Sequence, residues 1–203
     1  MFLILATLGG CKGCGDEAGS TAPDAAPAPP SSLLDPELGL NVDIPSNWDR
    51  LPVDVEDEAS AAVLSARRRP PATREYRVAP RIDVSRARLE EAIPVEDLLR
   101  QTLDRTKAAL PAAQARIRRT TTSRWRVGAT DVAAFELTYS VLDPKGGEGW
   151  DVIQRTAVCV TKDAGERPFA VDVTATFVDE DNEKLGREVE TMLRSLHFTG
   201  STP

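Results

Sequence analysis

Three long stretches of alternating apolar and polar residues in the second half of the chain constrain its fold most. The first has its apolar positions at Ala133, Phe135, Leu137, Tyr139 and Val141. Residues 152–160 and 169–177 continue this period of two, which is typical of half-buried β-strands. Because only short polar loops separate the three stretches, they are expected to pair as an antiparallel meander. A further strand over 115–127 is expected to precede them.

Two segments have the period of an amphipathic helix. After Pro94, apolar residues recur on one face up to Leu110, with acids in the first turn and Lys107 in the last, as the helix dipole favours. The second helix follows the acidic run 179–183 and continues to Leu196. An apolar stripe of this kind indicates a helix lying on a sheet, so the sequence predicts a single α+β domain.

The first half of the chain gives shorter signals. Leu40, Val42 and Ile44 alternate with polar residues and predict a strand that ends at Pro45. Trp48 follows a turn and is expected to fill one end of the core. Weaker strands are predicted at 51–55, 62–67 and 78–84.

The N-terminus indicates export. The apolar run Phe2 to Leu8 leads into Leu8-Gly9-Gly10-Cys11, which has the form of a lipoprotein signal, so the mature chain is expected to begin at an acylated Cys11. This predicts a membrane-anchored lipoprotein of the bacterial cell envelope, periplasmic or in the outer membrane. No Lys or Arg precedes Lys12, and the alternative is a chance apolar start on a soluble protein.

Composition divides the chain into three parts. Residues 1–10 form the signal peptide, and residues 11–37, rich in Ala, Pro, Ser and Gly, form a disordered tether because they cannot bury enough apolar surface to fold. Residues 38–199 form the domain. The formal net charge of −7 argues against a nucleic-acid partner.

The usual carriers of catalysis are missing from the sequence. The single histidine, His197, has no recognisable partners and is expected to face solvent. The acidic run 179–183 does not fit a calcium loop, since Lys184 stands where that loop needs glycine. No cofactor or metal site is therefore expected. Cys159 is expected to be a buried, inert thiol, with a bridge to Cys14 as the alternative.

A partner surface is expected on the basic strand. The candidates for partner contact are Arg116, Arg118, Trp125 and Trp150. The alternative for the arginines is a solvated strand face, and for both tryptophans it is ordinary packing in the core or at a strand edge.

The order of these features resembles the PsbP-like and DcrB-like family. In that family a strand with a glycine followed by an aromatic residue leads to Pro, Gly and Trp, and the last helix ends in a strand of the Ser-Leu-x-Phe type. The matching residues are Gly39, Pro45, Trp48, Ser195, Leu196 and Phe198, while Leu40 and Asn47 depart from the pattern. The resemblance covers about residues 38–198 and implies a small α/β/α sandwich, an antiparallel sheet flanked by helices. It also implies a binding or assembly factor, since members are mostly not enzymes.

Three functions follow from these observations. The first is a lipid-anchored, non-catalytic envelope protein that binds an unknown envelope protein or glycan. The second is a carrier of a small ligand or lipid, which needs an apolar cavity between the helix at Leu99 and the strand at Phe135. The third is a hydrolase, which needs two acids with shifted pKa values in one cleft.

Overall fold

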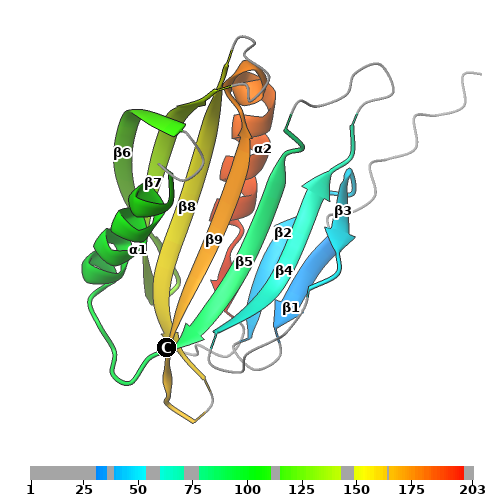
Figure 1. Ribbon diagram of the computed structural model, residues 1–203. Helices are drawn as coiled ribbons and strands as arrows, with labels where there is room; N and C mark the ends of the chain where they lie inside the picture. The colour runs from blue at the N-terminus through cyan, green and yellow to red at the C-terminus, as the bar shows by residue number, and fades with distance from the viewer. Residues whose placement is uncertain are drawn as a thin grey trace, which may run out of the picture.

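The computed structural model describes residues 31–35, 39–53, 60–70, 78–110, 115–142, 149–163 and 165–198. The strands are β1 Ser31–Asp35, β2 Leu40–Ile44, β3 Trp48–Leu51, β4 Ser60–Arg68, β5 Arg81–Arg88, β6 Ala115–Val127, β7 Thr130–Val141, β8 Trp150–Lys162, β9 Pro168–Val178 and β10 His197–Phe198. The helices are α1 Val95–Ala109 and α2 Asn182–Arg194 (Figure 1), and one 3-10 turn, Asp179–Asp181, leads into α2.

The larger sheet is antiparallel, with the strand order β3-β4-β5-β9-β8-β7-β6. Strands β6 to β9 form the predicted meander, with Val132 opposite Cys159 and Cys159 opposite Val171. On its other side β9 pairs with β5, which joins the meander to the hairpins of the first half of the chain. Among the described strands, β3 and β6 are therefore the two edges of this sheet.

A smaller sheet, β1-β2-β10, unites segments from both halves of the chain. Its middle strand β2 pairs with β1 through Leu33 opposite Val42, and with β10 through Phe198 opposite Leu40. Strand β1 lies in the range assigned to the tether, so the folded domain includes Ser31–Asp35 and does not begin at residue 38. The composition of residues 31–35 does not predict this strand. Backbone pairing to β2 holds β1 in place, and such pairing does not depend on composition.

Helix α1 covers one face of the larger sheet, as the apolar stripe after Pro94 predicted. The backbone N–H groups of Asp97 and Leu98 donate to the carbonyl oxygen of Pro94 and close the first turn. The residues buried between α1 and strands β7 to β9 are Leu98, Leu99, Leu110, Ala133, Phe135, Leu137, Val158 and Ala170. This cluster fills the space where a ligand carrier would need its cavity.

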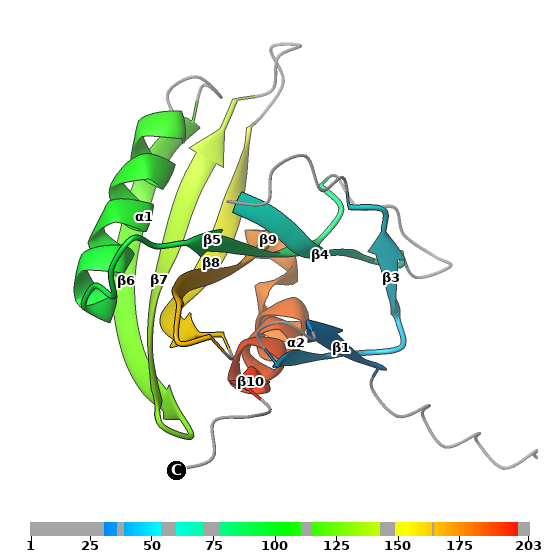
Figure 2. The same ribbon diagram turned by 90° about the horizontal axis from the view of Figure 1, so that it is seen from below.

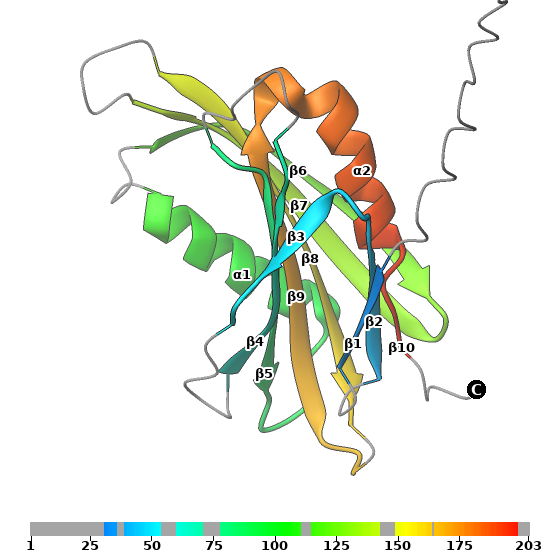
Figure 3. The same ribbon diagram turned by 90° about the vertical axis from the view of Figure 1, so that its right-hand side faces the viewer.

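The other face is covered by α2 and the smaller sheet. Figure 2 shows the larger sheet curving around them, and Figure 3 shows the two helices on opposite sides of the sheet. From α2 the core receives Leu185, Val189, Met192 and Leu193. Burial of each such side chain contributes about 1.5–3 kcal/mol. The layers are α1, the larger sheet, and α2 with the smaller sheet, which confirms the predicted α/β/α sandwich.

Trp48, the first residue of strand β3, fills one end of the core. It is only 5% exposed and packs into the α2-side cluster, as predicted. Strand β3 begins at Trp48, opposite Arg68 of β4, and ends at Leu51, so it lies earlier than the alternation of Leu51 and Val53 predicted. His197 is exposed while Leu196 is buried, which confirms the predicted alternation at the end of the domain.

Candidate functional site

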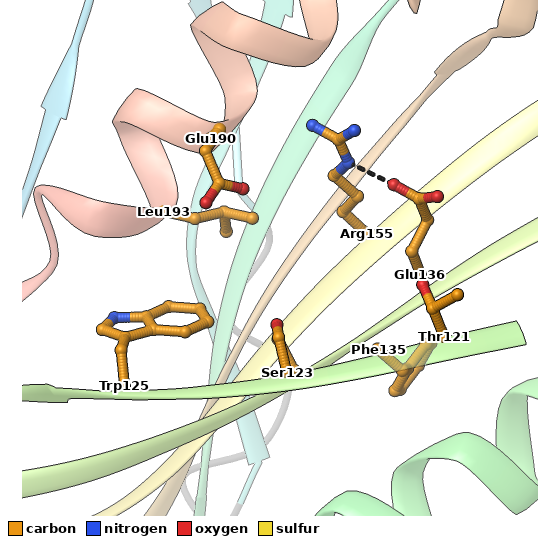
Figure 4. A pocket seen from close by; sticks show the side chains of 9 residues that line it. Thr121, Ser123, Trp125, Phe135, Glu136, Arg155, Glu190 and Leu193 are labelled. Atoms are coloured by element: carbon orange, nitrogen blue, oxygen red, sulfur yellow. Dashed lines mark hydrogen bonds and ion pairs between the residues drawn. The ribbon is translucent and has the colours of Figure 1, made fainter.

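A groove lies between α2 and the outer strands β6 and β7, on the concave face of the larger sheet. It encloses about 130 Å³. Its lining residues are Thr121, Ser123, Trp125, Ala134, Phe135, Glu136, Arg155, Glu190 and Leu193, of which Figure 4 labels all but Ala134. A second, more open hollow of about 360 Å³ is lined by charged residues of α2, namely Glu183, Lys184, Arg187 and Glu188.

The register of β6 and β7 explains which side chains reach the groove. Thr121 lies opposite Glu136, and Trp125 opposite Val132, a member of the α2-side core. Because side chains alternate between the faces of a strand, the odd-numbered residues from 121 to 125 all lie on the α2 side. The side chain of Phe135 packs instead in the α1-side cluster.

Trp125 forms one end of the groove, below Leu193 and Glu190 of α2 (Figure 4). Its ring is half-buried against the core, and the guanidinium of Arg194 lies 5.5 Å from the ring centroid. Arg194 also pairs with Glu190 at 2.6 Å. The indole N–H of Trp125 is buried and donates to no partner within the part of the chain that the structure describes. The alternative of core packing therefore applies to most of this ring, and only part of it faces the groove.

Arg155 fixes the opposite end of the groove to the helix. Its Nε donates to Oε2 of Glu136 at 2.7 Å, and its Nη1 donates to the carbonyl oxygen of Gly186 in α2 at 2.6 Å. Its guanidinium also lies 5.6 Å from the ring centroid of Phe177. One ion pair within the sheet and one charge-assisted hydrogen bond to the backbone of α2 therefore connect the helix to the floor of the groove.

Beside the groove, strand β6 carries a row of arginines. Arg124 pairs with Glu96 of α1 at 2.7 Å, and Arg126 pairs with Asp131 at 2.6 Å. Arg118 donates to the hydroxyl of Ser140 at 2.6 Å. The other two arginines are Arg116 and Arg119, both exposed. Within the described residues neither of these two contacts a carboxylate.

The structure brings three of the four predicted contact residues onto one strand. Arg116, Arg118 and Trp125 all belong to β6, and both arginines are exposed. Trp150 begins β8 opposite Val141, and the alternation of β8 places it on the α1 side of the sheet, away from the groove. Both tryptophans are half-buried, and their part in partner contact stays a prediction.

Sequence reasoning missed the residues that build the groove wall and floor. Glu136, Arg155 and Glu190 lie on three different elements and meet only in the folded chain. The alternation of Glu136 with apolar neighbours predicted a solvent-facing side chain, and its ion pair with Arg155 leaves no local pattern in the sequence.

The titratable groups with raised pKa values lie outside the groove. Burial, and then the charge of Asp172, raises the pKa of the Cys159 thiol to about 12, and this cysteine is 1% exposed and free. The prediction of a buried Cys159 is therefore confirmed, while Cys14 lies outside the described residues. Burial also raises the pKa of Asp172, although the hydroxyl of Ser85 donates to it at 2.6 Å. Asp172 lies on the α1 side of β9, so it does not converge with the groove carboxylates.

The groove contains no visible catalytic group. Its two acids, Glu136 and Glu190, each pair with an arginine. Across the described ranges, no three His, Cys, Asp or Glu side chains gather closely enough to hold a metal ion. None of the helices described has the length and apolar character to span a bilayer. Cys11, the predicted site of acylation, lies outside these residues.

These features define a class, a small antiparallel α/β/α sandwich in which a helix and an edge strand border a polar groove. The fold is PsbP-like, as the resemblance in the sequence predicted. The chain is similar to the solution structure of the PsbP protein of the cyanobacterium Synechocystis, with a TM-score of 0.54, 16% identity, and 95% of this chain and 99% of that chain covered.

It is also similar to the crystal structure of LpqN from Mycobacterium tuberculosis, with a TM-score of 0.50, 13% identity, and 83% of this chain and 90% of that chain covered. At these identities the likeness shows the fold alone. Neither a family model nor a curated protein sequence matches the chain.

Proposed function

We propose that this chain is a lipid-anchored, non-catalytic protein of the cell envelope that acts as a binding or assembly module. The segment Leu8-Gly9-Gly10-Cys11, with the form of a lipoprotein processing site, supports the anchor. LpqN, which shares the fold, is described as involved in cell envelope biogenesis, and this supports the location. More than one acyl chain on Cys11 would hold the domain stably at a membrane.

The observation that carries the binding role is the groove between α2 and strands β6 and β7. Arg155 ties its two sides together, and Trp125 supplies an aromatic wall. Both acids in the groove are ion-paired and are therefore poorly suited to accept or donate a proton in a reaction. Such an arrangement recognises a partner, protein or glycan, without changing its covalent structure.

The two other functions have less support. The groove of about 130 Å³ is smaller than the 300–1,000 Å³ typical of small-molecule sites, and the space between α1 and β7 is packed with side chains. The hollow of about 360 Å³ on α2 has the volume of such a site, but it is more open and is lined by charged residues. A hydrolase would need two acids with shifted pKa values in one cleft, but Asp172 and the groove acids lie on opposite faces of the sheet.

The anchor is tested by growing bacteria that express the full chain with an alkyne-tagged fatty acid. Wild type is expected to carry the tag and to sediment with membranes, and Cys11→Ala is expected to lose both properties. A Cys14→Ala variant serves as the matched control, and it should keep the tag. Equal labelling of wild type and Cys11→Ala would contradict the anchor.

The binding role is tested by photocrosslinking in the same membranes. The photoreactive p-benzoylphenylalanine is placed at Ser123 in the groove or, as control, at Asp104 on the exposed side of α1. One discrete adduct from position 123, absent from position 104, is expected. Adducts of equal yield at the two positions, or none at position 123, would contradict a binding groove.

A further inference from the structure

We infer that the partner is an acidic polypeptide segment that binds along β6 in an extended conformation and adds an eighth strand to the larger sheet. The inference rests on the proposed binding role and names the class of partner. It follows from three features of β6: the open edge, the charge of the strand, and the order of its groove-side residues.

The edge of β6 is long and accessible. It runs over thirteen residues, nine of them exposed, and it is the last strand of the sheet among those described. In an antiparallel pair, every second residue turns its N–H and C=O groups away from the neighbouring strand. Strand β6 thus presents a row of backbone donors and acceptors, which is the template that an added strand requires.

The charge of the strand selects an acidic partner. Five arginines and no acid lie in Ala115–Val127, although the chain as a whole has a net charge of −7. Arg124 and Arg126 already pair with acids of this chain. Arg116 and Arg119 make no such pair within the described ranges, so their charges are available to carboxylates on a neighbouring strand.

The order of residues along β6 predicts a pattern in the partner. Arg116 and Arg119 lie opposite Ser140 and Thr138, and Trp125 lies opposite Val132. The β-bulge between Ile117 and Arg119 keeps both arginines on the α2 side together with Trp125. A paired strand would place alternate side chains over these residues, with two acids opposite the arginines and an apolar residue opposite Trp125, roughly six residues beyond the nearer acid.

The same arginines exclude a second copy of this chain as the added strand. Antiparallel pairing of two β6 strands would bring arginines from both copies against each other, and like charges on paired strands are destabilising. Charged side chains and bulges are also the usual protection of an edge against self-association. The β6 edge therefore disfavours pairing with a second copy of this chain and favours pairing with a chain of opposite charge.

The experiment is a selection from a displayed library of random decapeptides against the full-length chain in detergent micelles. We expect the selected peptides to carry acids at two alternating positions and an apolar residue toward one end. Their binding is expected to fall by about tenfold or more in the Arg116→Glu, Arg119→Glu double variant.

The matched control is Arg67→Glu, Arg88→Glu, which changes the net charge equally at exposed positions on β4 and β5. It should bind the peptides as wild type does. Thermal unfolding of all three proteins checks that the fold is retained. Peptides N-methylated on the edge that pairs with β6 keep their charges but lose the backbone donors on that edge, and we expect them not to bind, whereas N-methylation of the other edge should be tolerated.

Three results would overturn the inference. The first is the selection of peptides without acids. The second is peptide binding that survives N-methylation of each edge in turn. The third is peptide binding that the Arg116→Glu, Arg119→Glu variant leaves intact and that a sulfated oligosaccharide displaces. Each would leave the fatty-acid labelling of Cys11 and the crosslink from position 123 unaffected. Failure of the strand-addition inference is thus distinguishable from failure of the proposed function.

Discussion

The two edge strands of the larger sheet differ in almost every respect. Strand β3 has four residues, whereas β6 has thirteen. Each contributes one tryptophan to the α2 side of the sheet. Trp48 of β3 is buried and donates its indole N–H to Oε2 of Glu188 at 3.4 Å, whereas Trp125 of β6 is half-buried and its N–H is unpaired within the described residues.

The difference extends to the arginines that accompany the two edges. Arg68, beside Trp48, donates to both carboxylate oxygens of Glu188, at 2.8 and 3.0 Å, and its side chain is 8% exposed. Along β6 the arginines are exposed, and their pairs are made at the surface. Beside Trp48, Arg68 is thus buried and bonded to α2, whereas the arginines of β6 lie at the surface, where a partner could reach them.

The largest expected effect is a loss of stability at the β3 edge. Trp48→Ala removes a buried ring from the α2-side core and leaves a cavity, so the free energy of unfolding should fall by about 3–5 kcal/mol. Denaturant titration measures this loss. Trp48→Phe, which keeps a ring but loses the N–H, should lose clearly less, and an equal loss in both variants would assign the effect to the hydrogen bond.

The next largest effect is expected at the ion pair of Arg68 with Glu188, beside Trp48. Arg68→Met leaves the carboxylate of Glu188 half-buried without its cation, and the free energy of unfolding should fall by about 2–3 kcal/mol. Combining it with Glu188→Leu removes the stranded charge, and we expect the double variant to recover part of the loss. If the double variant is no more stable than Arg68→Met, the loss comes mainly from the packing of the aliphatic part of Arg68 and not from the unpaired charge of Glu188.

At the β6 edge, Trp125 should matter less for stability than Trp48 does at the β3 edge. Trp125→Ala removes a half-buried ring and its contact with Arg194, so a loss of about 1–2 kcal/mol is expected. Its effect on peptide binding should be larger than its effect on unfolding. Equal destabilisation by Trp48→Ala and Trp125→Ala would remove the distinction between the two edges.

The smallest effect is expected at the surface pair of β6. A hydrogen bond from Arg126 lowers the pKa of Asp131, followed by a weaker effect of its charge. Because this pKa is lower in the folded state, the pair contributes above the unfolded pKa and its contribution is lost as pH falls through the folded pKa. Arg126→Ala should barely shift the unfolding midpoint, and NMR titration should show the pKa of Asp131 rising toward its ordinary value.

Local patterns predicted much of the fold. The meander and the two helices follow from periods of two and 3.6 residues, which a short segment displays by itself. The burial of Trp48 follows from its large apolar ring and its place after a turn. Pairing between distant strands has no such signal. Strand β5 pairs with β9, and Ser31–Asp35 pairs with β2. Both pairings depend on backbone contacts between distant segments, and the composition of one segment does not predict its partner.

The candidate site was less predictable than the fold. Arginine and threonine lie on both faces of β6, so the alternation that identifies a buried face is missing, and the groove side of Trp125 could not be assigned. Arg155 and Glu136 pair across two strands, and Arg155 also bonds to Gly186 of α2, which comes later in the chain. Of this region, the sequence indicated only the excess of arginine over 116–126 and Trp125 among them.

The smaller sheet sets the order in which the domain can be completed. Strand β2 pairs with β10, and the backbone of Asp43 is held by Ser195, 152 positions later in the chain. Contacts between such distant residues form slowly, since a long loop must close first. A ribosome would have to release almost the whole domain before β2 could gain its second neighbour. Until then β2 would have only β1 beside it, and the smaller sheet would remain incomplete.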